Sequence, residues 1–206
     1  MRLQRLTRPA LQPSERPPTL VMLHGLGSNE EDLMGLAPQL DPRLTVVAFQ
    51  APRVYGPGYS WFDIQFDEGG ITFNEEQAWE ALGVLAAEIE TLREENGRLF
   101  VGGFSQGGAM TMGVIMTRPE LLSGALILSG RMADHYEPND RVRGLPVLVQ
   151  HGRFDNVSPA ENGRRIATYL EAAGAQVKHK EYPMGHEVSF NSLVDLKQWI
   201  DTRIES

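Results

Sequence analysis

The sequence predicts an α/β protein with a mostly parallel, doubly wound sheet and helices on both faces of that sheet. Short apolar runs alternate along the chain with longer segments of helical period. The apolar runs are nearly uninterrupted, which is typical of strands buried on both faces. No repeat, low-complexity tract or linker divides the 206 residues, so we expect one domain over residues 1–206.

Strand and helix candidates follow one another in a regular order. Residues 9–18 contain four prolines and are predicted to form a lead-in turn. The predicted strands are 19–24, 44–50, 98–104, 125–129, 145–151 and 175–182. The predicted helices are 30–40, 74–97, 106–117, 160–173 and 189–204. Loops are expected at 51–73 and 130–144, and neither is long enough to hold a separate lid domain.

Local signals set the ends and faces of the helices. Ser28 precedes Glu31 at the spacing of a capping box and is expected to begin the first helix. Asn74 with Gln77 can cap the second helix, and Gly97 is placed as its C′ residue, just beyond the C-cap. The apolar face predicted for this second helix consists of Trp79, Leu82, Leu85, Ile89 and Leu92.

Composition excludes several classes of protein. The absence of cysteine excludes disulfides, cysteine-ligated metal sites and a thiol nucleophile. The net charge of −8 argues against sequence-independent nucleic-acid binding and against docking on an anionic membrane. No apolar run approaches the ~20 residues of a membrane-spanning helix, and the N-terminus lacks the apolar segment of a signal peptide. We therefore expect a cytoplasmic protein without stable membrane insertion.

The segment Gly103-Phe104-Ser105-Gln106-Gly107 is the sharpest chemical signal. The pattern G-x-S-x-G occurs often by chance, but here it joins an apolar strand to a helical segment. That context is typical of a nucleophile elbow, a strained turn that exposes the serine hydroxyl. The flanking glycines avoid a clash where helix and strand approach closely. Ser105 is therefore the predicted nucleophile; the alternative is a glycine-rich turn with an incidental serine.

A serine nucleophile needs a base within hydrogen-bond reach and an acid that orients the base. In doubly wound hydrolases these residues follow in the order serine, acid, histidine. His186 lies in a loop between the last strand and the last helix, and is the predicted base. Asp155 follows the end of the strand at 145–151 and is the predicted acid. The less favoured candidates are His179, expected to be an exposed strand residue, and Asp134 and Asp140.

Two backbone N–H groups should stabilise the oxyanion of the tetrahedral intermediate. One belongs to Gln106, the residue after the nucleophile, and the other to Leu26, which glycines flank in the loop after the first strand. His24 and His151 are expected to be buried structural residues. The Gly-x-Gly pair beside Leu26 is not a dinucleotide fingerprint, because Glu30 occupies the position of the third glycine.

The predicted loop 51–73 is rich in aromatic residues for a surface segment. Its aromatic residues are Tyr55, Tyr59, Trp61, Phe62, Phe66 and Phe73. They either form an apolar groove beside the serine or anchor the loop to the sheet. Trp61, Phe62 and Tyr59 are the predicted substrate-binding residues. Met110, Met112 and Met116 follow the nucleophile at helical spacing and are expected in the core.

Several segments together resemble the carboxylesterase/phospholipase family of α/β-hydrolases, which includes the acyl-protein thioesterases. They are Leu23-His24-Gly25-Leu26-Gly27, Ala51-Pro52-Arg53 with Trp61-Phe62-Asp63, GGFSQGGA at 102–109, and the His151-Gly152, Asp155 and Gly185-His186 run. The resemblance implies a single α/β-hydrolase domain without a cap domain and without a cofactor or metal. It implies the triad Ser105, Asp155 and His186 and the oxyanion donors Leu26 and Gln106, and it suggests a homodimer.

The expected activity is hydrolysis of carboxylic esters with short to medium acyl chains, at an accessible site. Acyl-protein thioesterase or lysophospholipase activity on the same triad stays open. A dienelactone hydrolase-like enzyme is disfavoured because it would typically use a cysteine, which the chain lacks. A non-catalytic ligand-binding protein on a hydrolase fold is the remaining alternative.

Overall fold

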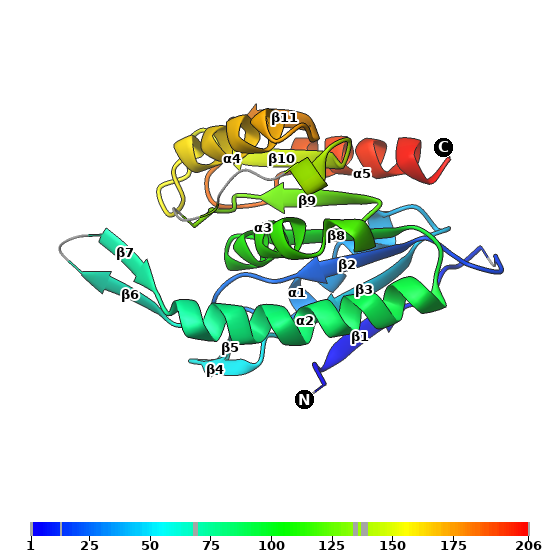
Figure 1. Ribbon diagram of the computed structural model, residues 1–206, viewed down its shortest axis with the longest axis horizontal. Helices are drawn as coiled ribbons and strands as arrows, with labels where there is room; N and C mark the ends of the chain where they lie inside the picture. Colours follow the sequence, from blue (N-terminus) through cyan, green and yellow to red (C-terminus); the bar gives the residue numbers. More distant parts are fainter. Residues whose placement is uncertain (1, 13, 68–69, 134–135, 137–139, 206) are drawn as a thin grey trace.

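The computed structural model describes residues 2–12, 14–67, 70–133, 136 and 140–205. Within these residues a seven-stranded sheet has the order β1-β3-β2-β8-β9-β10-β11 (Figure 1). Its strands are β1 Arg5–Arg8, β2 Thr19–Leu23, β3 Thr45–Phe49, β8 Leu99–Phe104, β9 Gly124–Leu128, β10 Pro146–Gly152 and β11 Gln176–Tyr182. Edge strand β1 pairs antiparallel with β3, and the other neighbours pair parallel. The predicted mostly parallel sheet is confirmed.

Helices cover both faces of this sheet. They are α1 Glu30–Met34, α2 Glu75–Glu95, α3 Gln106–Thr117, α4 Ala160–Ala172 and α5 Phe190–Ile204. Short 3₁₀ turns follow at Ala37–Gln39, Pro119–Leu121 and Asp140–Val142. Helices α2, α3 and α4 pack on one face, and α1 and α5 on the other. None of the described helices is long and apolar enough to cross a membrane.

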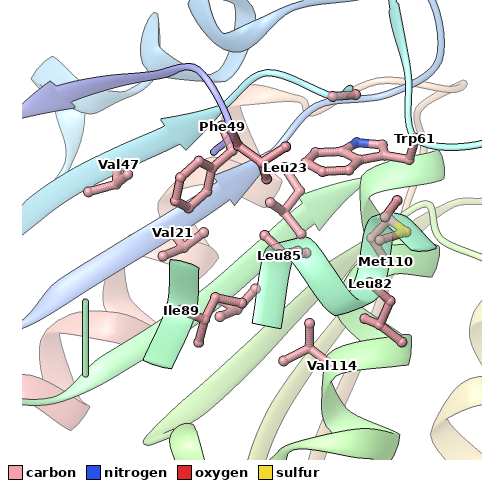
Figure 2. Packing of buried hydrophobic residues seen from close by; sticks show 14 of the residues in the cluster. Val21, Leu23, Val47, Phe49, Trp61, Leu82, Leu85, Ile89, Met110 and Val114 are labelled. Atoms are coloured by element: carbon pink, nitrogen blue, oxygen red, sulfur yellow. The ribbon is translucent and has the colours of Figure 1, made fainter. Parts of the chain in front are cut away.

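Alternation along the strands explains why they are apolar at almost every position. Val21 and Leu23 of β2 point toward α2 and α3, where Leu85 lies fully buried (Figure 2). The intervening residue Met22 packs on the opposite face, in the cluster that contains Trp199 of α5. Because side chains of a strand alternate between faces, a strand covered on both sides must be apolar throughout.

Three pairings of strands lay outside the prediction. The predicted loop 51–73 contains two hairpins, β4 Arg53–Tyr55 with β5 Gly58–Ser60, and β6 Ile64–Asp67 with β7 Gly70–Phe73. The second hairpin extends away from the sheet (Figure 1). The third pairing is that of β1 with β3. Its sequence RLTR has only one apolar residue, and it is held by main-chain pairing and by Arg8, whose guanidinium donates to backbone carbonyls.

The first helix is shorter than expected and its cap differs. It ends at Met34, before the proline-containing 3₁₀ turn, whereas the prediction extended it to residue 40. Its N-cap is Asn29, whose Oδ1 accepts the Glu31 N–H at 2.9 Å, and not Ser28. The Ser28 hydroxyl donates instead to the Asp32 carboxylate.

The second helix confirms both predicted ends and corrects one residue of its predicted apolar face. Asn74 Oδ1 accepts the Gln77 N–H at 3.1 Å, as predicted. Asn96 is the C-cap, so Gly97 occupies the C′ position, as predicted. A Cβ at Gly97 would lie 2.6 Å from the carbonyl oxygen of Arg16, so the close approach of that backbone is what requires glycine there. Trp79 was expected in the core but is 47% exposed, and it lies on the side of α2 that borders the cavity described below.

Candidate active site

Ser105 occupies a strained turn between β8 and α3. Its backbone has φ 55° and ψ −115°, a region that residues with a side chain rarely adopt, at a typical cost of ~1–3 kcal/mol. The surrounding structure enforces it: a Cβ on Gly103 would overlap the carbonyl of Gly107, and one on Gly107 would overlap the carbonyl of Leu23. The turn has the geometry expected of a nucleophile elbow.

The three residues predicted as a triad lie in one hydrogen-bonded chain. The Ser105 hydroxyl is 2.9 Å from His186 Nε2, and His186 Nδ1 is 2.7 Å from Asp155 Oδ2. The residues follow the carboxyl ends of β8, β11 and β10, so the parallel sheet brings together side chains 81 and 31 residues apart. The ring of Phe104 packs on the His186 imidazole with 4.7 Å between centroids, which restrains its orientation.

Asp155 is a buried carboxylate whose two oxygens are both engaged. Oδ2 faces His186, and Oδ1 accepts the backbone N–H groups of Val157 at 3.0 Å and Ser158 at 2.7 Å. Burial alone would raise the pKa of Asp155, but the hydrogen bonds from His186 and from these N–H groups outweigh burial and hold the pKa below its usual value. The carboxylate therefore stays ionised near neutral pH and can orient the imidazole.

The other histidines and acids considered from sequence lie elsewhere or act structurally. His151 is fully buried, donates from Nε2 to the Ser158 carbonyl at 2.7 Å, and lies 3.6 Å from Asp155 Oδ2. Burial lowers the pKa of His151, so its imidazole is neutral near pH 7. His179, expected to be exposed, is half-buried in β11 beside Glu181. Asp140 begins a 3₁₀ turn, and Asp134 lies outside the described residues.

Both predicted oxyanion donors border the same cavity as Ser105. Gln106 is the first residue of α3, so its N–H has no acceptor within the helix. Leu26 lies in a loop whose backbone is held on either side: the Gly27 N–H donates to the Tyr59 carbonyl at 2.8 Å, and the Ser28 N–H to that of Gly25 at 3.2 Å.

An apolar cavity of about 290 Å³ opens beside the Ser105 hydroxyl. Its walls come from α2, α3, the start of the β6–β7 hairpin and the segment after β9. The lining residues include Phe62, Ile64, Phe73, Trp79, Leu82, Ala109, Met110, Gly113 and Met132, together with the charged Glu75 and Arg131. Met110 therefore borders the cavity as well as the core, whereas Met112 and Met116 are buried in the core as predicted. No group of three or more His, Asp or Glu side chains in the described segments could hold a metal ion.

Two of the three aromatic residues predicted to bind substrate do not border the cavity. Trp61 is 0% exposed and lies in the core (Figure 2), with its indole N–H donating to the His24 carbonyl at 3.0 Å. Tyr59 packs on the same core and pairs through its backbone with Ser28. Phe62 does line the cavity. Trp79 was missed as a lining residue because its helical spacing matched that of core positions.

Comparison with known proteins identifies the family and the fold. Residues 9–204 match the Phospholipase/Carboxylesterase family. A probable carboxylesterase of Oryza sativa subsp. japonica is 30% identical over 211 residues, covering 91% of this chain and 78% of the rice protein. Acyl-protein thioesterase 1 of Gibberella zeae is 36% identical over 110 residues, covering 50% of this chain and 47% of that protein. The crystal structure of esterase PE8 has a TM-score of 0.85 at 25% identity, covering 98% of this chain and 99% of that chain.

A mostly parallel sheet with an elbow serine at the end of a central strand defines an α/β-hydrolase. The chain belongs to the phospholipase/carboxylesterase family, as the sequence motifs indicated. It is accordingly an ester hydrolase of the serine type.

Proposed function

We propose that the protein hydrolyses carboxylic esters of short to medium acyl chains through an acyl-enzyme on Ser105. The observation that carries the proposal is the unbroken hydrogen-bond chain from the Ser105 hydroxyl through His186 to Asp155, which opens on an apolar cavity. A serine near neutral pH is a weak nucleophile, and this arrangement supplies the base and the orienting acid that it needs.

In the first step Ser105 Oγ attacks the ester carbonyl while His186 Nε2 takes the hydroxyl proton. The carbonyl oxygen becomes an oxyanion that the N–H groups of Leu26 and Gln106 stabilise. Asp155 keeps the imidazole proton on Nδ1, so that Nε2 is free to accept, and stabilises the imidazolium that forms. The imidazolium then protonates the leaving alcohol, which departs and leaves the acyl group on Ser105.

In the second step the same residues act on water. His186 removes a proton from a water molecule, the hydroxide attacks the acyl carbonyl, and the second tetrahedral intermediate collapses. The returning proton restores the Ser105 hydroxyl and releases the carboxylic acid. Neither step requires a metal or a cofactor.

The size and lining of the cavity support the proposed chain length. Its volume of about 290 Å³ is just below the usual range for ligand pockets, ~300–1,000 Å³, which favours short to medium chains over long ones. Apolar walls from α2 and α3 suit a hydrocarbon chain and offer it no hydrogen bonds. The similarity to an acyl-protein thioesterase favours thioester cleavage as a second activity, since a thiolate can leave from the same tetrahedral intermediate.

The test is a series of p-nitrophenyl esters, from acetate to dodecanoate, measured beside acyl thioesters. Ser105→Ala is expected to lower kcat by roughly 10⁶-fold, because the nucleophile is lost while the fold is kept. An organophosphonate should label one serine per chain, and that serine should be Ser105. Ser123→Ala is the control. The Ser123 hydroxyl accepts the Leu99 N–H just before the start of β9, at the edge of the sheet opposite to that of Ser105.

The outcomes separate the alternatives. Near-full activity of Ser105→Ala would overturn the proposal. An unlabelled, inactive protein that binds esters would identify a ligand-binding protein on a hydrolase fold. A higher kcat/KM for thioesters than for oxygen esters of equal chain length would make thioester cleavage the principal activity.

A further inference from the structure

The segment Gly58–Phe62, here called the strap, contacts both halves of the predicted oxyanion hole. We propose that the strap sets the spacing between the two oxyanion donors, with the indole of Trp61 and the side chain of Gln106 as its positioning groups. This inference rests on the proposed function, since it concerns the same oxyanion. It reassigns Trp61, which sequence reasoning had placed among the substrate-binding residues.

The strap first pairs with the loop that carries Leu26. The Gly27 N–H donates to the Tyr59 carbonyl, and the Tyr59 N–H donates to the Ser28 carbonyl, each at 2.8 Å. The two backbones lie so close that a Cβ on Gly58 would overlap the carbonyl of Gly27. Reciprocal bonds of this kind leave the Leu26 loop little freedom to move away from the strap.

Trp61 restrains the start of the same loop through its side chain. Its indole N–H donates to the carbonyl of His24 at 3.0 Å, two residues before Leu26. The His24 ring lies 5.7 Å from the indole, and its Nε2 accepts the Ala51 N–H at 3.0 Å. Trp61 is fully buried, so no water can replace the indole as donor without a rearrangement.

Gln106 attaches the strap to the nucleophile elbow. Its Oε1 accepts the Trp61 N–H at 2.9 Å, and its Nε2 donates to the Phe62 carbonyl at 2.7 Å. The side chain is buried, with the whole residue 4% exposed. Gln106 therefore has two roles. Its backbone N–H is one oxyanion donor, and its side chain is hydrogen-bonded to the strap, which in turn contacts the loop that carries the other donor, Leu26.

Such a link acts on the transition state more than on the bound substrate. Oxyanion donors must lie ~2.7–3.1 Å from the position of the developing charge, and a displacement of about 1 Å can lower the rate roughly 100-fold. A neutral ester carbonyl depends far less on those donors. Loosening the strap should therefore lower kcat and leave KM nearly unchanged.

The experiment compares Trp61→Phe and Gln106→Met with the parent protein on p-nitrophenyl butyrate, with active sites counted by organophosphonate titration. Trp61→Phe removes the indole N–H. Gln106→Met removes the side-chain hydrogen bonds to the Trp61 N–H, the Phe62 carbonyl and the Ser60 hydroxyl, but keeps the backbone donor at position 106. Each should lower kcat about 10- to 100-fold, with KM within about twofold. The midpoint of the pH–rate profile should be unchanged, because neither substitution replaces a member of the proposed triad.

The affinity for a trifluoromethyl ketone distinguishes a role in positioning the oxyanion donors from a role in stability alone. Its serine adduct carries an oxyanion, so its affinity should fall by the same factor as kcat/KM in both variants. Trp199→Phe is the matched control. Trp199 is 1% exposed on the opposite face of the sheet, and its indole nitrogen has no hydrogen-bond partner among the described residues. This control should keep kcat and the ketone affinity.

Unchanged kcat in Trp61→Phe and Gln106→Met would overturn the inference, and so would a loss expressed only in KM. Failure of both variants to fold under conditions where Trp199→Phe is folded would also overturn it, because the strap would then serve stability alone. An active Ser105→Ala variant would instead overturn the proposed function, so the two failures are distinguishable.

Discussion

Asp155→Asn tests the electrostatic part of the site without changing the size of the side chain. In the native site Oδ1 accepts two backbone N–H groups and Oδ2 accepts the proton on His186 Nδ1. An asparagine has only one oxygen, and the two N–H groups of Val157 and Ser158 outnumber the single imidazole donor. The amide oxygen should therefore stay with the loop, and the amide NH₂ should face His186.

That arrangement imposes the wrong tautomer on the base. Facing an NH₂ donor, His186 Nδ1 must be the acceptor, so the imidazole proton moves to Nε2 and points at the Ser105 hydroxyl. The base can then no longer take the serine proton. We expect kcat to fall about 10⁴-fold, equivalent to about 5.4 kcal/mol of transition-state stabilisation, with little change in KM.

The assay is steady-state hydrolysis of p-nitrophenyl butyrate at pH 7, per titrated active site. Asp140→Asn is the control, because Asp140 is an exposed carboxylate in a 3₁₀ turn that sequence reasoning also considered as the acid. It should retain full activity. If Asp155→Asn keeps more than about a tenth of the parent kcat, the tautomer argument is refuted.

Two further predictions concern stability and chain length. Burial lowers the pKa of His24 and His151, so below about pH 6.5 the unfolded chain binds protons that the native state does not. Urea titrations should show the unfolding free energy falling with decreasing pH, by up to about 1.4 kcal/mol per pH unit for each histidine, and His151→Gln should flatten this slope. Gly113→Leu should reduce the volume of the cavity, which both Gly113 and Leu82 line. A Cβ at Gly113 would already lie 3.2 Å from the Leu82 methyl groups, so the larger side chain must extend into the cavity or displace Leu82. The substitution should lower kcat/KM for octanoate about tenfold more than for acetate, and equal losses would contradict this lining.

Sequence reasoning selected the three residues of this hydrogen-bonded chain, Ser105, Asp155 and His186, because each obeys a local rule. Ser105 stands between a strand and a helix with glycines where a Cβ would overlap the backbone, and the chemistry of a serine nucleophile required an acid and a histidine farther along the chain. The parallel sheet then brought Asp155 and His186 to the same edge as Ser105. These positions follow from the order of elements and need no knowledge of side-chain packing.

The second helix shows where periodicity alone is insufficient. Trp79 matches the helical spacing of Leu82, Leu85 and Ile89, so the sequence predicts a core position. In the structure Leu82, Leu85 and Ile89 join the buried core, whereas Trp79 is half exposed and borders the cavity. Edge strand β1 was missed for a related reason, since its pairing with β3 depends on backbone hydrogen bonds and leaves little apolar pattern.

The aromatic residues of the predicted loop 51–73 were ambiguous for a deeper reason. Tyr59 and Trp61 could contact either substrate or protein, and their spacing favours neither. Their roles depend on partners far away in the chain, Trp61 on the His24 carbonyl 37 residues before it and on the Gln106 side chain 45 residues after it. Residues such as Ser105 can be found from a local motif. Residues such as Trp61, which hold other groups in place, can be recognised only in the folded structure, where partners far apart in the sequence come into contact. The measurements on Trp61→Phe and Gln106→Met therefore test the part of the site that the sequence left undetermined.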